Sequence, residues 1–357
     1  MRLDRIQKQL AQRQAVLALA PGDDFRYAVG WSPKGDERPT YLIVSSRMAR
    51  LVIASVNAEE AQSHLGNIVQ IGRFGDDEGP EAMLREVANR LQGLPWLISD
   101  DARYGHGLLL ERIIGQPLGL ASEVMAPLRM QKDEDECHLL ARCQEINDQA
   151  MRAAYEAMRV GMSELELADI IRRAFIANGA DKEAFIIVAY GAHSAMPHHT
   201  PTTTKLGEGP VLLDIGCYYH GYASDMTRVA YLGQPTERFV EIHGLVDAAV
   251  RAAQARALPG IAAQEVDRAA RQVIAAQGYG LAFVHRVGHG IGLSVHESPS
   301  VAEGNRLPLP ANAAFSIEPG VYLPGEFGVR LEEVVILRPT GAQILSHVPR
   351  SVYVKPL

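Results

Sequence analysis

The chain has 357 residues, of which 47% are hydrophobic and 22% are charged, with a formal net charge of −7. This length and composition suit a globular protein of two domains, and the lack of a basic stripe argues against a nucleic-acid partner. No run approaches the ~18 apolar residues of a membrane span, so we expect no membrane contact. The apolar run at residues 15–20 is too short for a signal peptide, and the three cysteines form no disulfide framework. We therefore expect a cytoplasmic protein.

Residues 1–128 alternate helical and strand patterns, which predicts a small α/β domain. We expect helices at Arg5–Leu19 and Glu81–Leu91, and strands at Tyr41–Val44, Leu51–Val56 and Trp96–Ser99.

Residues 129–357 open on an acidic run that is typical of a helix start, because negative side chains are favourable at a helix N-terminus. We expect helices at Asp133–Val160, from Ser163 to near Gly179, at Pro235–Leu258 and at Ala263–Ala276. The second of these begins with a capping-box pattern. The helices alternate with antiparallel hairpins, so we predict an α+β fold.

The first predicted hairpin pairs two aspartates. The runs Val211–Cys217 and Ala223–Leu232 read as strands on either side of a short turn. With a turn centre at 219–220, Asp214 and Asp225 lie opposite one another, with Cβ atoms ~5 Å apart.

A second predicted hairpin pairs two glutamates in the same way. The runs Ala314–Tyr322 and Val329–Leu337 flank a glycine-containing loop, and Glu318 and Glu332 are equidistant from Gly325. The sequence therefore predicts two carboxylate pairs on apolar strands.

Carboxylates placed side by side repel one another unless cations neutralise them. His289 lies in a glycine-rich run between the two hairpins and offers one imidazole to the same group. Oxygen-rich ligation with a single imidazole suits Mn, Co, Fe or Zn, as a pair of ions ~3.5 Å apart that share a hydroxide. We predict two divalent ions. The ligand types do not choose among these metals; Mn²⁺ is our first choice, with Co²⁺ or Zn²⁺ as alternatives.

The segments around these positions carry a family resemblance. LLDIGCYYHGYASDMTR, GHGIGLSVHESP, FSIEPGVY and GVRLEEVV together resemble the "pita-bread" metallopeptidases, which include Xaa-Pro dipeptidases (prolidases), Xaa-Pro aminopeptidases and methionine aminopeptidases. The resemblance covers residues 138–340. It implies a pita-bread catalytic domain at 129–357, behind a creatinase/prolidase-like α/β domain at 1–128. By the same resemblance Asp214 binds one metal ion, His289 and Glu318 bind the other, and Asp225 and Glu332 bridge both.

The resemblance also implies catalytic and substrate-binding roles. His198 and His296 match family residues that contact the scissile carbonyl, and Glu318 matches a general base. His285 matches a histidine close to the pocket, and Arg330 matches a partner of the first aspartate that holds its orientation.

Two further histidines in the segment that carries His198 are interpreted differently. We read His193 and His199 as solvated loop histidines, because no motif includes them.

One departure from the family pattern concerns substrate binding. Many dipeptidases of the family carry an arginine just after HExP, where it binds the carboxylate of the C-terminal proline, but here Ser300 stands at that position. A free carboxylate in a closed pocket needs a cation. Arg306, Arg47 and Arg50 are candidates, and we choose Arg47, from the same chain or from a partner subunit.

We therefore predict a dinuclear-metal Xaa-Pro dipeptidase that acts on small peptides as a homodimer. The first alternative is an Xaa-Pro aminopeptidase that releases the N-terminal residue from longer peptides. A non-catalytic peptide-binding module of the same fold is the alternative from a different class, and the intact ligand set disfavours it.

Overall fold

A computed structural model describes residues 2–357, which fold as two compact units that divide between Arg129 and Met130. The sequence placed this division one residue earlier. Each unit has its own buried apolar core, and the predicted α+β class is confirmed.

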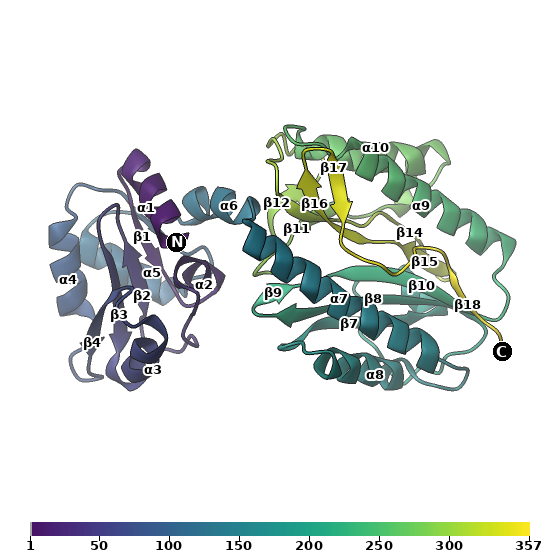
Figure 1. The fold of residues 1–357 in the computed structure, drawn as a ribbon, viewed down its shortest axis with the longest axis horizontal. Helices are drawn as coiled ribbons and strands as arrows, with labels where there is room; N and C mark the ends of the chain where they lie inside the picture. The colour runs from purple at the N-terminus through teal and green to yellow at the C-terminus, as the bar shows by residue number, and fades with distance from the viewer. Residues whose placement is uncertain (1) are drawn as a thin grey trace. The chain divides into compact units, whose positions relative to one another are not determined.

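The first unit is built on a sheet with strand order β4-β3-β2-β1-β5-β6, flanked by helices (Figure 1). β1 lies inside this sheet, antiparallel to β2 and parallel to β5. The strands are β1 (Val16–Leu19), β2 (Tyr41–Val44), β3 (Ala49–Ala54), β4 (Gln70–Phe74), β5 (Trp96–Ile98) and β6 (Gly119–Leu120). The helices are α1 (Arg2–Arg13), α2 (Asp23–Val29), α3 (Ser55–Leu65), α4 (Glu81–Arg90), α5 (Tyr104–Ile114) and α6 (Ser122–Met130).

The predicted helix Arg5–Leu19 is wrong in its second half. The helix ends at Arg13, Gln14 takes a left-handed φ of 50°, and Val16–Leu19 forms the fully buried strand β1. A short continuous apolar run fits a buried strand as well as a helix, so hydrophobic periodicity could not separate the two.

The second unit contains two pairs of helices, each packed on its own sheet (Figure 1). Helices α7 (Glu134–Ala157) and α8 (Glu164–Ala177) cover the sheet β18-β10-β8-β7. Helices α9 (Glu237–Arg256) and α10 (Ala263–Ala276) cover the sheet β12-β11-β13-β16-β17. The capping box predicted for α8 is confirmed, and α7 begins with another.

The strands of this unit are β7 (Lys182–Tyr190), β8 (Gly209–Tyr219), β9 (Tyr222–Ala223), β10 (Met226–Leu232), β11 (Gly288–Gly290), β12 (Glu297–Val301), β13 (Ala314–Ile317), β14 (Gly320–Leu323), β15 (Phe327–Arg330), β16 (Glu333–Arg338), β17 (Gly341–Ile344) and β18 (Tyr353–Lys355). Two short 3₁₀ helices, η1 (Gly191–Ala195) and η2 (Gly280–Ala282), complete it.

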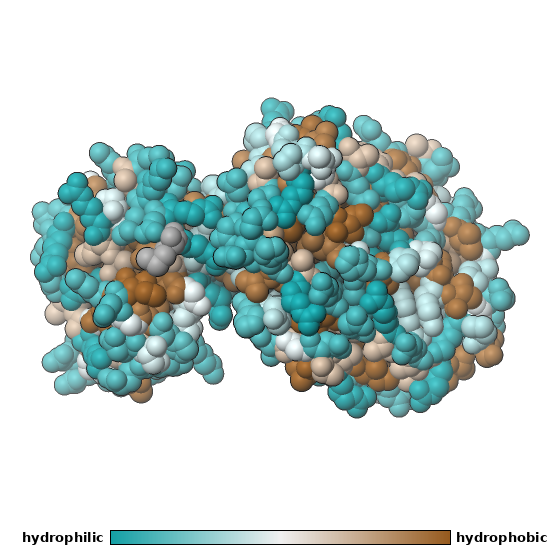
Figure 2. Space-filling model, viewed as in Figure 1, coloured by the Kyte–Doolittle hydropathy of each residue, from teal (hydrophilic) through white to brown (hydrophobic). Residues whose placement is uncertain are grey.

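Hydrophilic residues dominate the face of the molecule shown in Figure 2, and the apolar patches between them are small. Over residues 2–357, no helix has the combined length and hydropathy needed to cross a membrane.

The first hairpin has a different register from the one predicted. Asp214 pairs with Thr227 rather than with Asp225, because the turn is centred one residue later, on His220 and Gly221. Both turn residues have positive φ, 48° and 81°, as a two-residue type I′ turn requires. Asp225 therefore lies two residues before the partner of Asp214, in the break between β9 and β10.

The second hairpin has the predicted register. Ile317 pairs with Glu333 and Gly320 pairs with Arg330, so Glu318 and Glu332 lie opposite one another between these two pairs.

The turn at His220 makes a test of this register possible. A β-branched residue is strained in the left-handed region, so we expect His220→Val to lower the free energy of unfolding by about 1 kcal/mol. His220→Asn should preserve or raise it, because asparagine favours this conformation. Urea unfolding measures both variants, and equal stability of the two would contradict the assigned turn.

Candidate metal centre

A single cavity of about 410 Å³ in the second unit collects most of the predicted site residues. All five predicted metal ligands line it, as do His198, His285, His296 and Arg330. Apolar side chains, among them Phe185, Ile187 and Val295, form the rest of its wall together with Pro197 and Arg286.

Three of the acidic side chains occupy breaks between strands. Asp225 follows β9 and precedes β10, Glu318 lies between β13 and β14, and Glu332 lies between β15 and β16. At each break the chain leaves one set of strand hydrogen bonds before it joins the next. The acidic side chain at the break is therefore not confined to one face of a continuous strand. Asp214 and His289 lie within β8 and β11.

The glycines beside His289 are required by close packing. A Cβ atom at Gly288 would lie 1.9 Å from the Ser316 carbonyl oxygen, and one at Gly290 would lie 2.1 Å from the Ser298 carbonyl oxygen. Only glycine lets β11 pass between β12 and β13 at this distance. The motif Gly-His-Gly therefore places the imidazole of His289 in the cavity.

Hydrogen bonding selects one tautomer of His289. Its Nδ1 lies 3.1 Å from the carbonyl oxygen of Gly290, which can only accept a hydrogen bond, so Nδ1 carries the proton. Nε2 faces the carboxylates, 3.1 Å from Glu318 Oε1 and 3.6 Å from Asp225 Oδ2. With a proton, Nε2 donates to Glu318; without it, the ring is the neutral Nδ1–H tautomer, whose Nε2 lone pair is free. This is the tautomer that a metal-binding imidazole needs.

Burial and mutual repulsion perturb the acidic side chains. Burial, followed by the charges of neighbouring carboxylates, raises the pKa values of Asp225 and Glu332 well above those of ordinary carboxyl groups. Burial also acts to raise the pKa of Glu318, but the hydrogen bond and charge of His289 outweigh it and lower that pKa to about 2. The cavity therefore concentrates more negative charge than its own cationic side chains neutralise.

The residues present fit a pair of divalent cations. Asp214 Oδ1 and Glu332 Oε1 are buried and have no hydrogen-bond partner. Ligand atoms of Asp225, His289 and Glu332 lie within 4.8 Å of one another. Cations would occupy the unpaired oxygens and remove the repulsion, and carboxylates with one imidazole are donors that Mn²⁺, Co²⁺ and Zn²⁺ accept.

Arg330 is committed to the protein rather than to a ligand. Its Nη2 lies 2.6 Å from Asp214 Oδ2, its Nη1 donates to the Tyr322 hydroxyl at 2.7 Å, and its Nε donates to Thr227 Oγ1 at 3.1 Å. Thr227 in turn donates to Glu332 Oε2 at 2.8 Å. Arg330 thus orients ligands from both hairpins, and its predicted ion pair with Asp214 is present.

Three histidines surround the ligand set. His285 Nδ1 faces the Arg286 carbonyl oxygen at 2.8 Å, so its Nε2 accepts from the Tyr322 hydroxyl, also at 2.8 Å. Burial lowers the pKa values of His285 and His296. Within the described chain, His198 and His296 have no hydrogen-bond partner, and both are exposed at the cavity. Their rings are therefore available to a bound molecule.

The predicted carboxylate anchor is not among the second-unit residues that line this cavity. Arg47 is an exposed residue of the first unit, and Arg306 is exposed outside the lining. Sequence reasoning missed Arg286, which lines the cavity and donates to Ser300 Oγ at 3.2 Å. Arg286 directly follows His285, which the sequence did place near the pocket, and this neighbouring position could have identified it.

Several known proteins are similar to this chain. Residues 138–339 match the metallopeptidase family M24. The chain is similar to the probable dipeptidase PepE of Mycobacterium tuberculosis, with 36% identity over 96% of this chain and 92% of the relative. It is also similar to the Xaa-Pro dipeptidase of Lactobacillus delbrueckii subsp. lactis, with 31% identity over the full length of both.

A solved structure extends the likeness to the whole fold. The prolidase from Thermococcus sibiricus superimposes with a TM-score of 0.92 and 33% identity, covering 99% of this chain and 98% of that one.

The charge repulsion in the cavity can be tested with Asp225→Asn. We expect the metal-free variant to melt at a higher temperature than the metal-free parent, because burial and the neighbouring carboxylates disfavour the ionised aspartate. Saturating Mn²⁺ should stabilise the parent by about 2.7 kcal/mol at 100 times the Kd, and the variant much less. Calorimetry with and without chelator measures both effects, and a lower midpoint for the metal-free variant would contradict the electrostatic account.

Proposed function

The chain belongs to metallopeptidase family M24, and from that premise we propose that it is a metal-dependent Xaa-Pro dipeptidase, which hydrolyses the peptide bond before a C-terminal proline. The observation that carries the proposal is the convergence of Asp214, Asp225, His289, Glu318 and Glu332 on one cavity. The volume of that cavity lies in the range of small-ligand sites.

These five residues would hold two divalent ions, with Asp225 and Glu332 shared between them. Bound there, such ions polarise a carbonyl group and lower the pKa of water to near neutrality. We propose Mn²⁺ as the ion in use, and the donor set also accepts Co²⁺ or Zn²⁺. Arg330 supports this arrangement by keeping Asp214 and, through Thr227, Glu332 in fixed orientations.

The side chains around the ligand set supply the proton transfers and hydrogen bonds. Glu318 is ionised, so its carboxylate can accept a proton from the attacking water as the water oxygen bonds to the scissile carbon. His198 and His296 donate N–H bonds to the carbonyl oxygen as negative charge develops on it. When the C–N bond breaks, the proton held by Glu318 passes to the proline nitrogen.

We propose that Arg286 binds the carboxylate of the C-terminal proline. Within the part of the chain that the structure describes, Arg286 and Arg330 are the cationic Arg/Lys side chains that line the cavity, and Arg330 is already paired with Asp214. Arg286 is half-buried and reaches Ser300, the position where many family members carry the carboxylate-binding arginine. Arg47, supplied by a partner copy, is the alternative anchor.

The remaining proposals concern assembly and compartment. We propose a homodimer, the commonest symmetric oligomer, in which the first unit of one copy limits substrate length at the other. Cys137, Cys143 and Cys217 are all free thiols, which supports a reducing cytoplasm.

Substrate length distinguishes the two peptidase activities. With Mn²⁺ present, we expect efficient hydrolysis of an Xaa-Pro dipeptide and little release of the first residue from Xaa-Pro tripeptides or longer peptides. Chromatographic product analysis over this series measures it. Efficient cleavage of the longer peptides would establish the aminopeptidase alternative, and cleavage of none would favour a binding module.

The carboxylate anchor is tested with Arg286→Gln. Loss of one hydrogen-bonded ion pair is expected to reduce kcat/KM for an Xaa-Pro dipeptide by about 10- to 150-fold, mainly through KM. The Xaa-prolinamide analogue has no carboxylate, so parent and variant should cleave it equally. Arg306→Gln serves as the matched control and should behave as the parent. A dipeptide-specific defect in Arg47→Gln, with none in Arg286→Gln, would transfer the role to Arg47.

A further inference from the structure

The segment from Gly191 to Thr204 carries His198 to the cavity and is fastened on one side to β15. Arg330 Nη2 donates to the carbonyl oxygen of Pro197 at 3.3 Å, and the backbone N–H of Gly328 donates to Ser194 Oγ at 2.8 Å. A Cβ atom at Gly328 would lie 2.1 Å from the Ser194 carbonyl oxygen, so this contact is tight. The residue before His198 is thus held by the network that orients the metal ligands.

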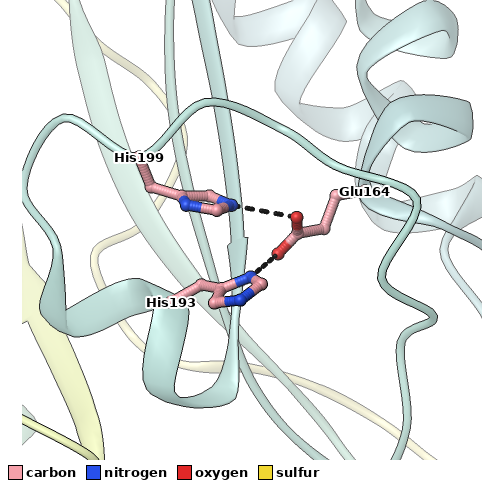
Figure 3. Close-up of side chains that lie close together, drawn as sticks. All are labelled: Glu164, His193 and His199. Atoms are coloured by element: carbon pink, nitrogen blue, oxygen red, sulfur yellow. Dashed lines mark hydrogen bonds and ion pairs between the residues drawn. The ribbon is translucent and has the colours of Figure 1, made fainter.

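On its other side the segment is fastened to Glu164, at the first turn of α8. Figure 3 shows two imidazoles directed at the two oxygens of this carboxylate: His193 Nδ1 lies 2.8 Å from Oε1, and His199 Nε2 lies 2.9 Å from Oε2. We predicted that both histidines are solvated. The prediction is wrong for His199, which is buried, whereas His193 is half-buried. The side chain of Glu164 is fully buried.

Hydrogen-bond donors of the protein occupy all the acceptor sites of the Glu164 carboxylate. The backbone N–H of Tyr190 donates to Oε1 at 2.9 Å, and Thr202 donates to Oε2 through its N–H at 2.9 Å and its hydroxyl at 2.8 Å. With the two histidines, five donors meet a group that has about four lone-pair sites, so the cluster is complete without an ion. Burial acts to raise the pKa of Glu164, but these hydrogen bonds, led by that of His199, outweigh it and lower the pKa.

We propose that Glu164 is a positioning residue for His198. Its carboxylate fixes His199 while Arg330 fixes Pro197, so both neighbours of His198 are held and the imidazole between them keeps its direction into the cavity. The inference rests on the proposed function, in which His198 donates a hydrogen bond to the scissile carbonyl. A ring that is aimed in advance stabilises the transition state more than one that must be ordered during the reaction.

A double-mutant cycle on the full-length Mn²⁺ enzyme tests this role. We expect Glu164→Gln to lower kcat for an Xaa-Pro dipeptide by about 10- to 100-fold with KM nearly unchanged. His198→Ala should lower kcat by about 100- to 1,000-fold. Adding Glu164→Gln to His198→Ala should cause no further loss, because the positioned ring is gone. A merely structural role would instead multiply the two losses, and that result would overturn the proposal.

Glu166→Gln is the matched control, since Glu166 lies in the same helical turn but points to solvent and to the capping box. It should retain the kcat of the parent, and a loss equal to that of Glu164→Gln would overturn the proposal. If Glu164→Gln does not fold, His199→Gln breaks the same link from the other end and enters the same cycle.

Three further outcomes are decisive. A divalent ion retained beyond the two at the carboxylate centre, and lost in Glu164→Gln by elemental analysis, would make the cluster a metal site and overturn the positioning role. A parent without Xaa-Pro dipeptidase activity would overturn the proposed function and this inference with it. An active parent with an equally active Glu164→Gln variant would overturn this inference alone.

Discussion

Repulsion among buried carboxylates is the constraint on which the rest of the second unit depends. Burial and neighbouring charges raise the pKa values of Asp225 and Glu332, and the one arginine inside the ligand network, Arg330, is paired with Asp214. A flexible framework would relieve this repulsion by moving the side chains apart. Here two apolar cores, each with its own sheet and helices, keep the carboxylates from moving apart. Bound cations would therefore be what reduces the repulsion, and this reduction would contribute to the affinity for metal.

The same constraint explains why three of the five predicted ligands lie at interruptions of the strands. A continuous strand offers only alternate positions on one face, about 7 Å apart, which is too coarse a spacing for several groups on shared ions. Breaks before β10, β14 and β16 let Asp225, Glu318 and Glu332 approach one another. Beside His289, Gly288 and Gly290 have the corresponding role, because without side chains they let β11 lie close to both neighbouring strands.

Sequence reasoning was most successful where chemistry is encoded locally. The acidic positions stand in recognisable motifs, and the register that places Glu318 opposite Glu332 follows from symmetry about Gly325. It failed where the outcome depends on backbone conformation or on distant partners. The turn at His220 could be centred in more than one way. Nothing near His199 in the sequence indicates that Glu164, at the start of α8, accepts a hydrogen bond from it and that the ring is buried.

The position of the arginine that we propose for binding the substrate carboxylate follows from the geometry of the strands rather than from its position in a motif. β11 and β12 are antiparallel neighbours with His289 paired to Ser300, and the guanidinium of Arg286, shortly before β11, reaches the Ser300 hydroxyl. An arginine at position 300 would therefore put a second guanidinium against the first, and two like charges in one half-buried volume repel. In our proposal, a small hydroxyl at 300 and an arginine at 286 would satisfy the same requirement: one cation beside the carboxylate cluster, within reach of a substrate carboxylate one residue beyond the scissile bond. We therefore interpret the missing arginine of the motif as a relocation of charge from position 300 to Arg286, just before the adjacent strand β11, which would keep recognition of a dipeptide carboxylate possible in this chain.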